Sequence, residues 1–225
     1  MTSKILSIDV DYCLTSSDFI EVQELFCKNL FKIKEKENIL FSQYHVDILD
    51  LCLKCKGDLE VSNIDMHHDV FYQAPQSTAE IRNGISDSSN WVGWLAVHQP
   101  LKKYTWYKQP FSDEFSDELV EAFHNMYDKS GNYDIVDARN LIFNSKMAIT
   151  ELKNEHYLKQ KPKIEVETRI KKYLFDIDFD YLFVCLSPEY TPKEHYYMYE
   201  SLKSIKEEFF KSLGSKKNIQ NEGEA

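Results

Sequence analysis

Two aspartates and a histidine occupy alternate positions in one short segment of this sequence, residues 65–69. In an extended strand alternate side chains share a face, so Asp65, His67 and Asp69 are expected to converge, while His68 points to the other side. An apolar run precedes them, and burying two carboxylates without a counter-charge is costly. The pattern therefore predicts three ligands for a metal cation at the end of a strand.

A second acidic group occurs late in the chain, where Asp176, Asp178 and Asp180 again occupy alternate positions. Repulsion between neighbouring carboxylates favours a divalent ion or basic groups beside them. In parallel α/β sheets ligands bind beyond the carboxyl ends of the strands, so both acidic groups are expected to share one site. His45, at the start of a predicted helix, is a third candidate element of that site.

The composition excludes several classes of partner. The chain has 225 residues, with 27 Lys+Arg against 37 Asp+Glu and a net charge of −10, so it lacks the basic character that nucleic acids and anionic membranes require. No apolar run is long enough to span a membrane and no signal-peptide pattern opens the chain, which predicts a cytoplasmic protein. Most of the five cysteines are expected to be reduced, with Cys52 and Cys55 as helix-packing residues.

Hydrophobic patterning predicts an α/β protein, because short apolar runs alternate with longer amphipathic segments. Residues 1–213 are expected to form one domain, followed by a disordered tail over 214–225, and residues 73–90 read as a loop. Strands are expected over residues 5–12, 59–66, 104–107, 133–136, 172–179 and 182–186, and helices over 18–36, 46–53, 90–97, 117–127 and 192–213.

These motifs resemble those of the arginase/deacetylase superfamily, in particular its uncharacterised arginase-like members. The resemblance rests on His45, then Asp65-Met66-His67-His68-Asp69, then Asp176-Ile177-Asp178, in that order. Asn90-Trp91 and residues 187–192 are also similar to segments of that group. The resemblance implies a three-layer α/β/α sandwich with a mostly parallel sheet.

The family's ligand set, carried over position by position, implies one or two divalent ions, with Mn²⁺ first and Zn²⁺ or Fe²⁺ as alternatives. One ion would be bound by His45, Asp65, Asp69 and Asp176, and the other by Asp65, His67, Asp176 and Asp178. Asp65, His67 and Asp178 would be the catalytic residues of a hydrolase that cleaves a C–N bond, of the amidine or amide type, with a metal-activated water. Further metal or substrate contacts are expected from Asp9, Asp11, His68, Asn90, Trp91, Asp180 and Glu189.

Two departures from the family pattern leave alternatives open. The strand after the second acidic group carries no acid until Glu189, so arginine itself is a doubtful substrate. The second pair of ligands could also be Asp178 and Asp180 instead of Asp176 and Asp178. A site that keeps only Asp65, His67 and Asp178 would resemble the single-zinc deacetylases.

Two other functions compete with the hydrolase. The spacing of Asp9 and Asp11 resembles the opening motif of haloacid-dehalogenase phosphatases, with Asp9 as nucleophile and Asp11 as general acid. If the protein is not a phosphatase, Asp9 and Asp11 are expected to lie near the predicted metal site. The third alternative is a non-catalytic, metal-containing protein that binds a small molecule or another protein through residues 73–90.

Overall fold

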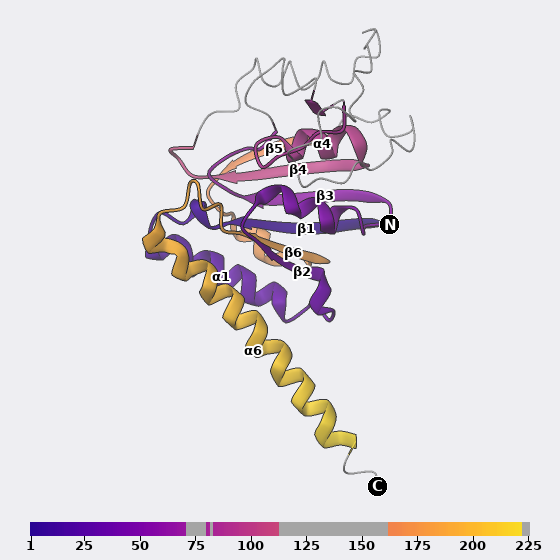
Figure 1. The fold of residues 1–225 in the computed structure, drawn as a ribbon, viewed down its shortest axis with the longest axis vertical. Helices are drawn as coiled ribbons and strands as arrows, with labels where there is room; N and C mark the ends of the chain where they lie inside the picture. The colour runs from indigo at the N-terminus through magenta and orange to yellow at the C-terminus, as the bar shows by residue number, and fades with distance from the viewer. Residues whose placement is uncertain (71–79, 82, 113–161, 222–225) are drawn as a thin grey trace.

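Six parallel strands form one sheet at the centre of the computed structural model, which describes residues 1–70, 80–81, 83–112 and 162–221. The order across the sheet is β2-β6-β1-β3-β4-β5, and each neighbouring pair is parallel (Figure 1). The carboxyl ends of the strands therefore lie along one edge. The strands are β1 (Thr2–Asp9), β2 (Ile39–Ser42), β3 (Asp58–Ile64), β4 (Leu101–Lys108), β5 (Lys163–Thr168) and β6 (Tyr181–Cys185).

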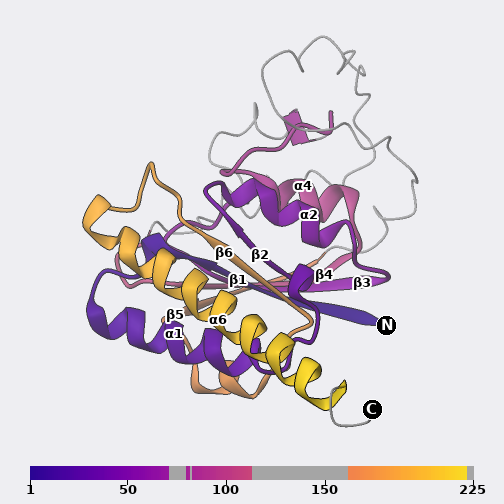
Figure 2. The ribbon, with the colours of Figure 1, turned by 60° about the horizontal axis from the view of Figure 1, so that its bottom comes forward.

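Helices cover both faces of the sheet. Helices α1 (Ser16–Leu30) and α6 (Tyr196–Asn221) lie against one face, and α2 (Leu49–Cys52) and α4 (Trp91–His98) against the other (Figure 2). The α/β class and the parallel sheet are thereby confirmed. Short 3₁₀ helices connect these elements: η1 (Val10–Tyr12), η2 (Lys36–Asn38), η3 (His45–Ile48), η7 (Lys172–Asp176) and η8 (Lys193–His195).

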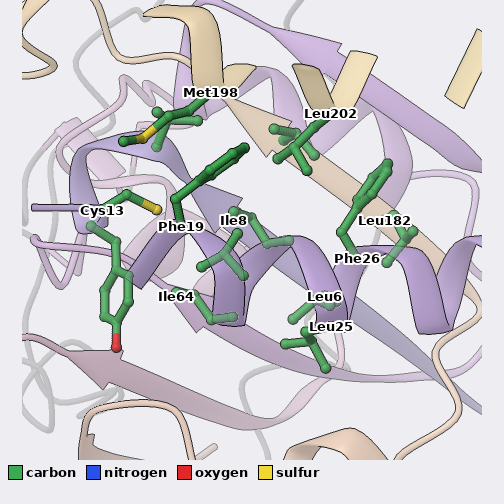
Figure 3. Packing of buried hydrophobic residues seen from close by; sticks show 14 of the residues in the cluster. Leu6, Ile8, Cys13, Phe19, Leu25, Phe26, Ile64, Leu182, Met198 and Leu202 are labelled. Carbon is green, nitrogen blue, oxygen red and sulfur yellow. The ribbon is translucent and has the colours of Figure 1, made fainter. Parts of the chain in front are cut away.

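Side chains of β1 point alternately into two hydrophobic cores, one on each face of the sheet. Leu6 and Ile8 face α1 and α6, where they belong to a buried cluster that includes Phe26 and Met198 (Figure 3). Ile5 belongs to the other cluster, beneath α2 and α4. Because side chains alternate along a strand, Ser7 and Asp9 face the α2/α4 side with Ile5. The polar ends of the strands therefore meet on the side that α4 covers.

Helix α1 begins and ends earlier than the sequence indicates. The hydroxyl of Thr15 accepts a hydrogen bond from the backbone N–H of Asp18 at 3.2 Å, and the Asp18 carboxylate accepts from the N–H of Thr15 at 2.9 Å. This reciprocal capping box starts the helix at Ser16, two residues before the expected start at residue 18. The helix ends at Leu30 instead of residue 36.

The expected strand over residues 172–179 is wrong. The chain forms the 3₁₀ helix η7 there, which buries Leu174, and Phe179 is buried further along in the turn that leads to β6. The alternating aspartates of this segment therefore precede a strand instead of ending one. Strands β2 and β5 were not expected, whereas the helix expected over 117–127 and the strand over 133–136 lie outside the described residues.

Helix α6 continues beyond the end expected for it. It extends to Asn221 through the segment expected to be a tail, and its later turns project past the sheet (Figure 1). Among the described helices, none combines the length and the apolar character that a membrane span requires.

Candidate metal centre

The polar site lies at the carboxyl edge of three neighbouring strands, β6, β1 and β3. Asp9 is the last residue of β1, and Asp11 follows in η1. Asp65 follows β3 directly, and His45 begins η3 after the edge strand β2. Parallel strands bring residues distant in sequence to the same edge, and this explains how the four side chains meet.

His45 lies at the centre of three carboxylates. Its Nδ1 atom is 3.2 Å from Oδ2 of Asp9, 3.1 Å from Oδ2 of Asp65 and 3.0 Å from Oδ2 of Asp69. All four side chains are almost fully buried, and Nδ1 makes no hydrogen bond of acceptable geometry within the described part of the chain. One nitrogen and three oxygens thus surround a single small volume.

The other side of the His45 ring is held by the protein. Nε2 is 2.8 Å from the hydroxyl of Ser7, and the ring stacks on Phe183 with centroids 5.5 Å apart. When Nε2 donates its proton to Ser7, the lone pair of Nδ1 faces the three carboxylates, which is the arrangement of a metal-binding histidine. Burial opposes a charge on this ring, but the three carboxylates outweigh it and raise the pKa of His45 well above its usual value.

Asp65 connects this position to a second one. Its Oδ2 faces His45, while its Oδ1 lies 3.8 Å from Nδ1 of His67 and accepts a hydrogen bond from the His67 backbone N–H at 2.8 Å. Burial, followed by the charges of Asp69 and Asp9, raises the pKa of Asp65 to about 7. Because its two oxygens face different histidines, the carboxylate is suited to bind two cations, one on each oxygen.

Asp11 and His67 form the second position. Nδ1 of His67 is 2.9 Å from Oδ2 of Asp11, and the His67 side chain is 24% exposed, so this position is the more open of the two. Burial and the charges of Asp9 and Asp65 raise the pKa of Asp11 well above its usual value. Burial opposes a charge on His67, but Asp11 and Asp65 outweigh it and raise its pKa to about 9.

Neighbouring groups orient the carboxylates. The indole N–H of Trp91 donates to Oδ2 of Asp69 at 2.8 Å. The Asn63 amide donates to Oδ2 of Asp65 at 3.0 Å, and the hydroxyl of Ser187 donates to Oδ2 of Asp9. Such outer contacts fix the direction of ligand lone pairs in metal sites.

Two site residues adopt a left-handed backbone. Asp69 has a φ of 51° and Ser187 a φ of 44°, values that cost energy for residues other than glycine. In both cases the side chain hydrogen-bonds within the site: Asp69 with Trp91, and Ser187 with Asp9. Two of the three described non-glycine residues with a positive φ therefore belong to the site, and the third, Arg169, lies outside it.

The structure does not bring the second predicted acidic group to this site. Asp176 and Asp178 lie before β6, at the amino edge of the sheet, with side chains 81% and 79% exposed. They pair with Lys28 of α1 and with Lys32, two residues beyond the end of α1, respectively. Asp180 is at the same edge, where its carboxylate accepts a hydrogen bond from the backbone N–H of Lys4 at 2.8 Å. The expected convergence of the two acidic groups is therefore corrected: Asp9 and Asp11 join the first group instead.

The remaining predicted residues divide between site and core. Trp91 contacts both His45, at 5.0 Å between ring centroids, and Asp69. Asn90 is buried, and its side-chain oxygen accepts a hydrogen bond from the backbone N–H of Asp87 at 2.9 Å. His68 packs edge-on against Trp106, and burial together with His67 lowers its pKa to about 4. Glu189 is exposed in the turn after β6.

Sequence reasoning missed three supporting residues, Ser7, Asn63 and Ser187, as partners of ligands. Ser7 and Asn63 lie two residues before Asp9 and Asp65 on their strands, so they share a face with those ligands. A polar residue two positions before an acidic strand end is the signal that could have found the first two.

The spacing of the donor atoms fits a metal ion. Ligands about 2.1 Å from a tetrahedral metal lie roughly 3.4 Å from one another, close to the distances of 3.0 to 3.2 Å from Nδ1 of His45 to its three carboxylate oxygens. Three groups have ligand atoms that all lie within 4.8 Å of one another: His45 with Asp65 and Asp69, His67 with Asp11 and Asp65, and His45 with Asp9 and Cys185. The carboxylates and imidazoles of the first two groups, without a thiolate, suit Mn²⁺, Fe²⁺ or Zn²⁺.

Comparisons with models of known protein families, with curated proteins and with solved structures found no match.

Proposed function

We propose that this protein is a metal-dependent hydrolase that cleaves a C–N bond of the amidine or amide type in a small molecule. The observation that carries the proposal is the Nδ1 atom of His45, which is buried without a hydrogen-bond partner in the described chain and faces three carboxylate oxygens at 3.0 to 3.2 Å. A buried cluster of this charge needs a cation, and a divalent ion matches its donors.

The arrangement of the ligands supports the arginase-like character of the proposal. The residues implied by that resemblance are a histidine at a helix start, an Asp-x-His-x-Asp segment after a strand and an Asp-x-Asp segment after a strand. His45 and residues 65–69 supply the first two. Asp9 and Asp11 supply the third, in the roles first given to Asp176 and Asp178, so the Asp-x-Asp segment comes first along this chain.

Two cations would be held in this arrangement. His45, Asp9, Asp65 and Asp69 would hold the buried one. Asp65, His67 and Asp11 would hold the other, with Asp65 as bridge. The bound metal would supply a hydroxide at neutral pH and polarise the carbon that is attacked.

The protein's own groups would act on the open side of the centre. Nδ1 of His67 lies 2.9 Å from Oδ2 of Asp11 at the more open position, and the exposed ring of Tyr190 lies 4.5 Å from the imidazole of His67 between centroids. A substrate would reach the centre over these residues. Tyr190 would provide an apolar wall for it, while His67 and Asp11 would hold the cation on this side of the centre.

The phosphatase alternative receives less support from the geometry. It requires the Asp9 carboxylate to attack phosphorus, but this carboxylate is 2% exposed. Its Oδ2 atom is also engaged by Ser187 and by His45. An oxygen enclosed in this way serves better as a ligand than as a nucleophile.

The test begins with metal content. Protein purified without chelator and reconstituted with Mn²⁺ is compared with the variants Asp65→Asn and Asp178→Asn by elemental analysis. We expect one or two equivalents of Mn²⁺ in the wild type and in Asp178→Asn, and at most trace metal in Asp65→Asn. Absence of metal from the wild type after reconstitution with Mn²⁺ or Zn²⁺ would refute the proposal.

Catalysis is tested on the reconstituted protein. A panel of small amidines, guanidines and amides is assayed for release of ammonia, urea or amine, with Asp65→Asn as the inactive control. Turnover that depends on metal supports the hydrolase. Stable metal binding with retention of an unmodified compound would instead favour the non-catalytic binding protein.

A further inference from the structure

A buried thiol lies beside the His45 position. Cys185 is the last residue of β6, and in the sheet register it is opposite Asp9 of β1 and Ser42 of β2. Its side chain is fully buried, with Sγ 3.5 Å from the backbone oxygen of Gln43 and 3.2 Å from the hydroxyl of Ser187. The carboxyl edge of the sheet therefore contains a sulfur donor in addition to oxygen and nitrogen donors.

Cys185 is also close enough to two candidate ligands to share a metal ion with them. Its Sγ, a carboxylate oxygen of Asp9 and a ring nitrogen of His45 all lie within 4.8 Å of one another. All three residues are at least 98% buried. Nδ1 of His45, without a hydrogen-bond partner in the described chain, is the independent sign that a ligand belongs here.

We infer that Asp9, His45 and Cys185 form a thiophilic metal position that takes Zn²⁺ or Cd²⁺ and competes with the oxygen-rich position made by His45, Asp65 and Asp69. The inference rests in part on the proposed metal centre, because both positions use His45 and Asp9. Thiolate donors select zinc-group ions, whereas carboxylates suit Mn²⁺, so the two positions have opposite preferences.

Binding at the thiophilic position has a defined balance of bonds and protons. The S–H bond of Cys185 breaks, a sulfur–metal bond forms, and the thiol proton is released to solvent together with the proton that the three carboxylates hold on the His45 ring in the metal-free protein. Nδ1 of His45 donates one lone pair, and that lone pair serves one ion at a time. An ion bound to Cys185 therefore removes a ligand from the oxygen-rich position and displaces Mn²⁺ from it.

The experiment uses Cd²⁺ as the probe, added to the metal-free full-length protein. A cadmium–thiolate bond produces an ultraviolet charge-transfer band, which reports on sulfur ligation without any assay of activity. We expect the first equivalent of Cd²⁺ to produce this band in the wild type and in the control Cys55→Ser, which changes a partly exposed cysteine away from the site. The band should be lost in Cys185→Ser, whereas Mn²⁺ binding by that variant should be retained.

A second measurement needs no variant. Cd²⁺ is added to the Mn²⁺-loaded wild type, and free Mn²⁺ is followed by its electron paramagnetic resonance spectrum. We expect one equivalent of Cd²⁺ to release one equivalent of Mn²⁺. An unchanged band in Cys185→Ser would overturn the thiophilic position alone. The same conclusion would follow if the wild type bound Mn²⁺ normally but showed no band and no release of Mn²⁺.

The remaining outcomes separate this inference from the proposed function. A Cys185-dependent band in a protein that binds no Mn²⁺ would support the thiophilic position and count against the manganese centre. A wild type that binds neither ion would refute both.

Discussion

Nδ1 of His45 lies 3.1 Å from Oδ2 of Asp65, and both side chains are almost fully buried. The two residues come from different connections, one after β2 and one after β3, and two strands, β6 and β1, separate them in the sheet. This contact joins the two candidate metal positions, because the other oxygen of Asp65 faces His67.

Ser7 is expected to control the metal affinity of His45. Ser7→Ala removes the hydroxyl 2.8 Å from Nε2, so the ring loses the partner that directs its other nitrogen to the metal. We expect about 10- to 100-fold weaker Mn²⁺ binding by titration calorimetry. Ser62→Ala, in the neighbouring strand and on the opposite face of the sheet, is the matched control. Equal affinities in the two variants would refute this role of Ser7.

The two Asp-x-Asp segments are expected to respond differently to substitution. Asp9→Asn removes a carboxylate 3.2 Å from Nδ1 of His45, whereas Asp176→Asn removes an exposed carboxylate paired with Lys28. Elemental analysis after Mn²⁺ reconstitution should find metal lost from Asp9→Asn and retained in Asp176→Asn. The reverse result would restore the ligand set first expected from the sequence.

The metal-free protein is expected to lose stability as the pH rises. The folded protein retains the Asp65 proton up to about pH 7, whereas the unfolded chain releases it near the ordinary value of 3.8. His67 likewise retains its proton up to about pH 9 when folded, against 6.5 when unfolded. The folded state thus binds more protons across both windows, and each such proton lowers stability by about 1.4 kcal/mol per pH unit.

Thermal unfolding in the presence of chelator, from pH 5 to pH 9, measures this dependence. The midpoint of thermal unfolding should fall over that range. The contribution of Asp65 to this fall should be steepest between pH 5 and pH 7. Saturating Mn²⁺ should remove or reverse the trend, because metal binding displaces the same protons. A midpoint that rises with pH in the metal-free protein would contradict the arrangement of buried acids.

Tyr190 is expected to affect substrate binding without affecting the metal. Its ring lies beside His67, 4.5 Å between centroids, and contacts of this kind contribute about 0.5–1.5 kcal/mol. Tyr190→Ala should therefore raise KM by up to about 10-fold on any substrate found, with unchanged Mn²⁺ content. Tyr190→Phe keeps the ring and should behave as the wild type. Loss of metal in Tyr190→Ala would show instead that the ring supports His67 as a ligand.

The local pattern of the sequence was sufficient to predict one half of the site. Alternation along an extended chain predicts that Asp65 and Asp69 share a face. In the structure β3 ends at Ile64 and the backbone of Asp69 is left-handed, so the chain turns after the strand, yet both carboxylates still face Nδ1 of His45. The buried face of α1 follows from a different rule, the 3.6-residue spacing of its apolar residues. These are short-range relations, which the sequence contains directly.

The other half of the site depended on strand direction. Asp9 follows the apolar run of β1, whereas Asp180 and the acids before it precede the apolar run of β6. In a parallel sheet only acids that follow a strand reach the carboxyl edge. Composition and alternation are the same for both groups, so the order of acid and strand was the informative feature.

Anomalous diffraction from crystals grown with Mn²⁺ tests the central claim most directly, because it locates the ions without reference to activity. We predict a peak within bonding distance of Nδ1 of His45 and of the carboxylates of Asp9, Asp65 and Asp69, with a second peak near His67 and Asp11 when both positions are filled. A peak at Asp176 and Asp178, or no peak beside His45 at saturating Mn²⁺, would contradict the account.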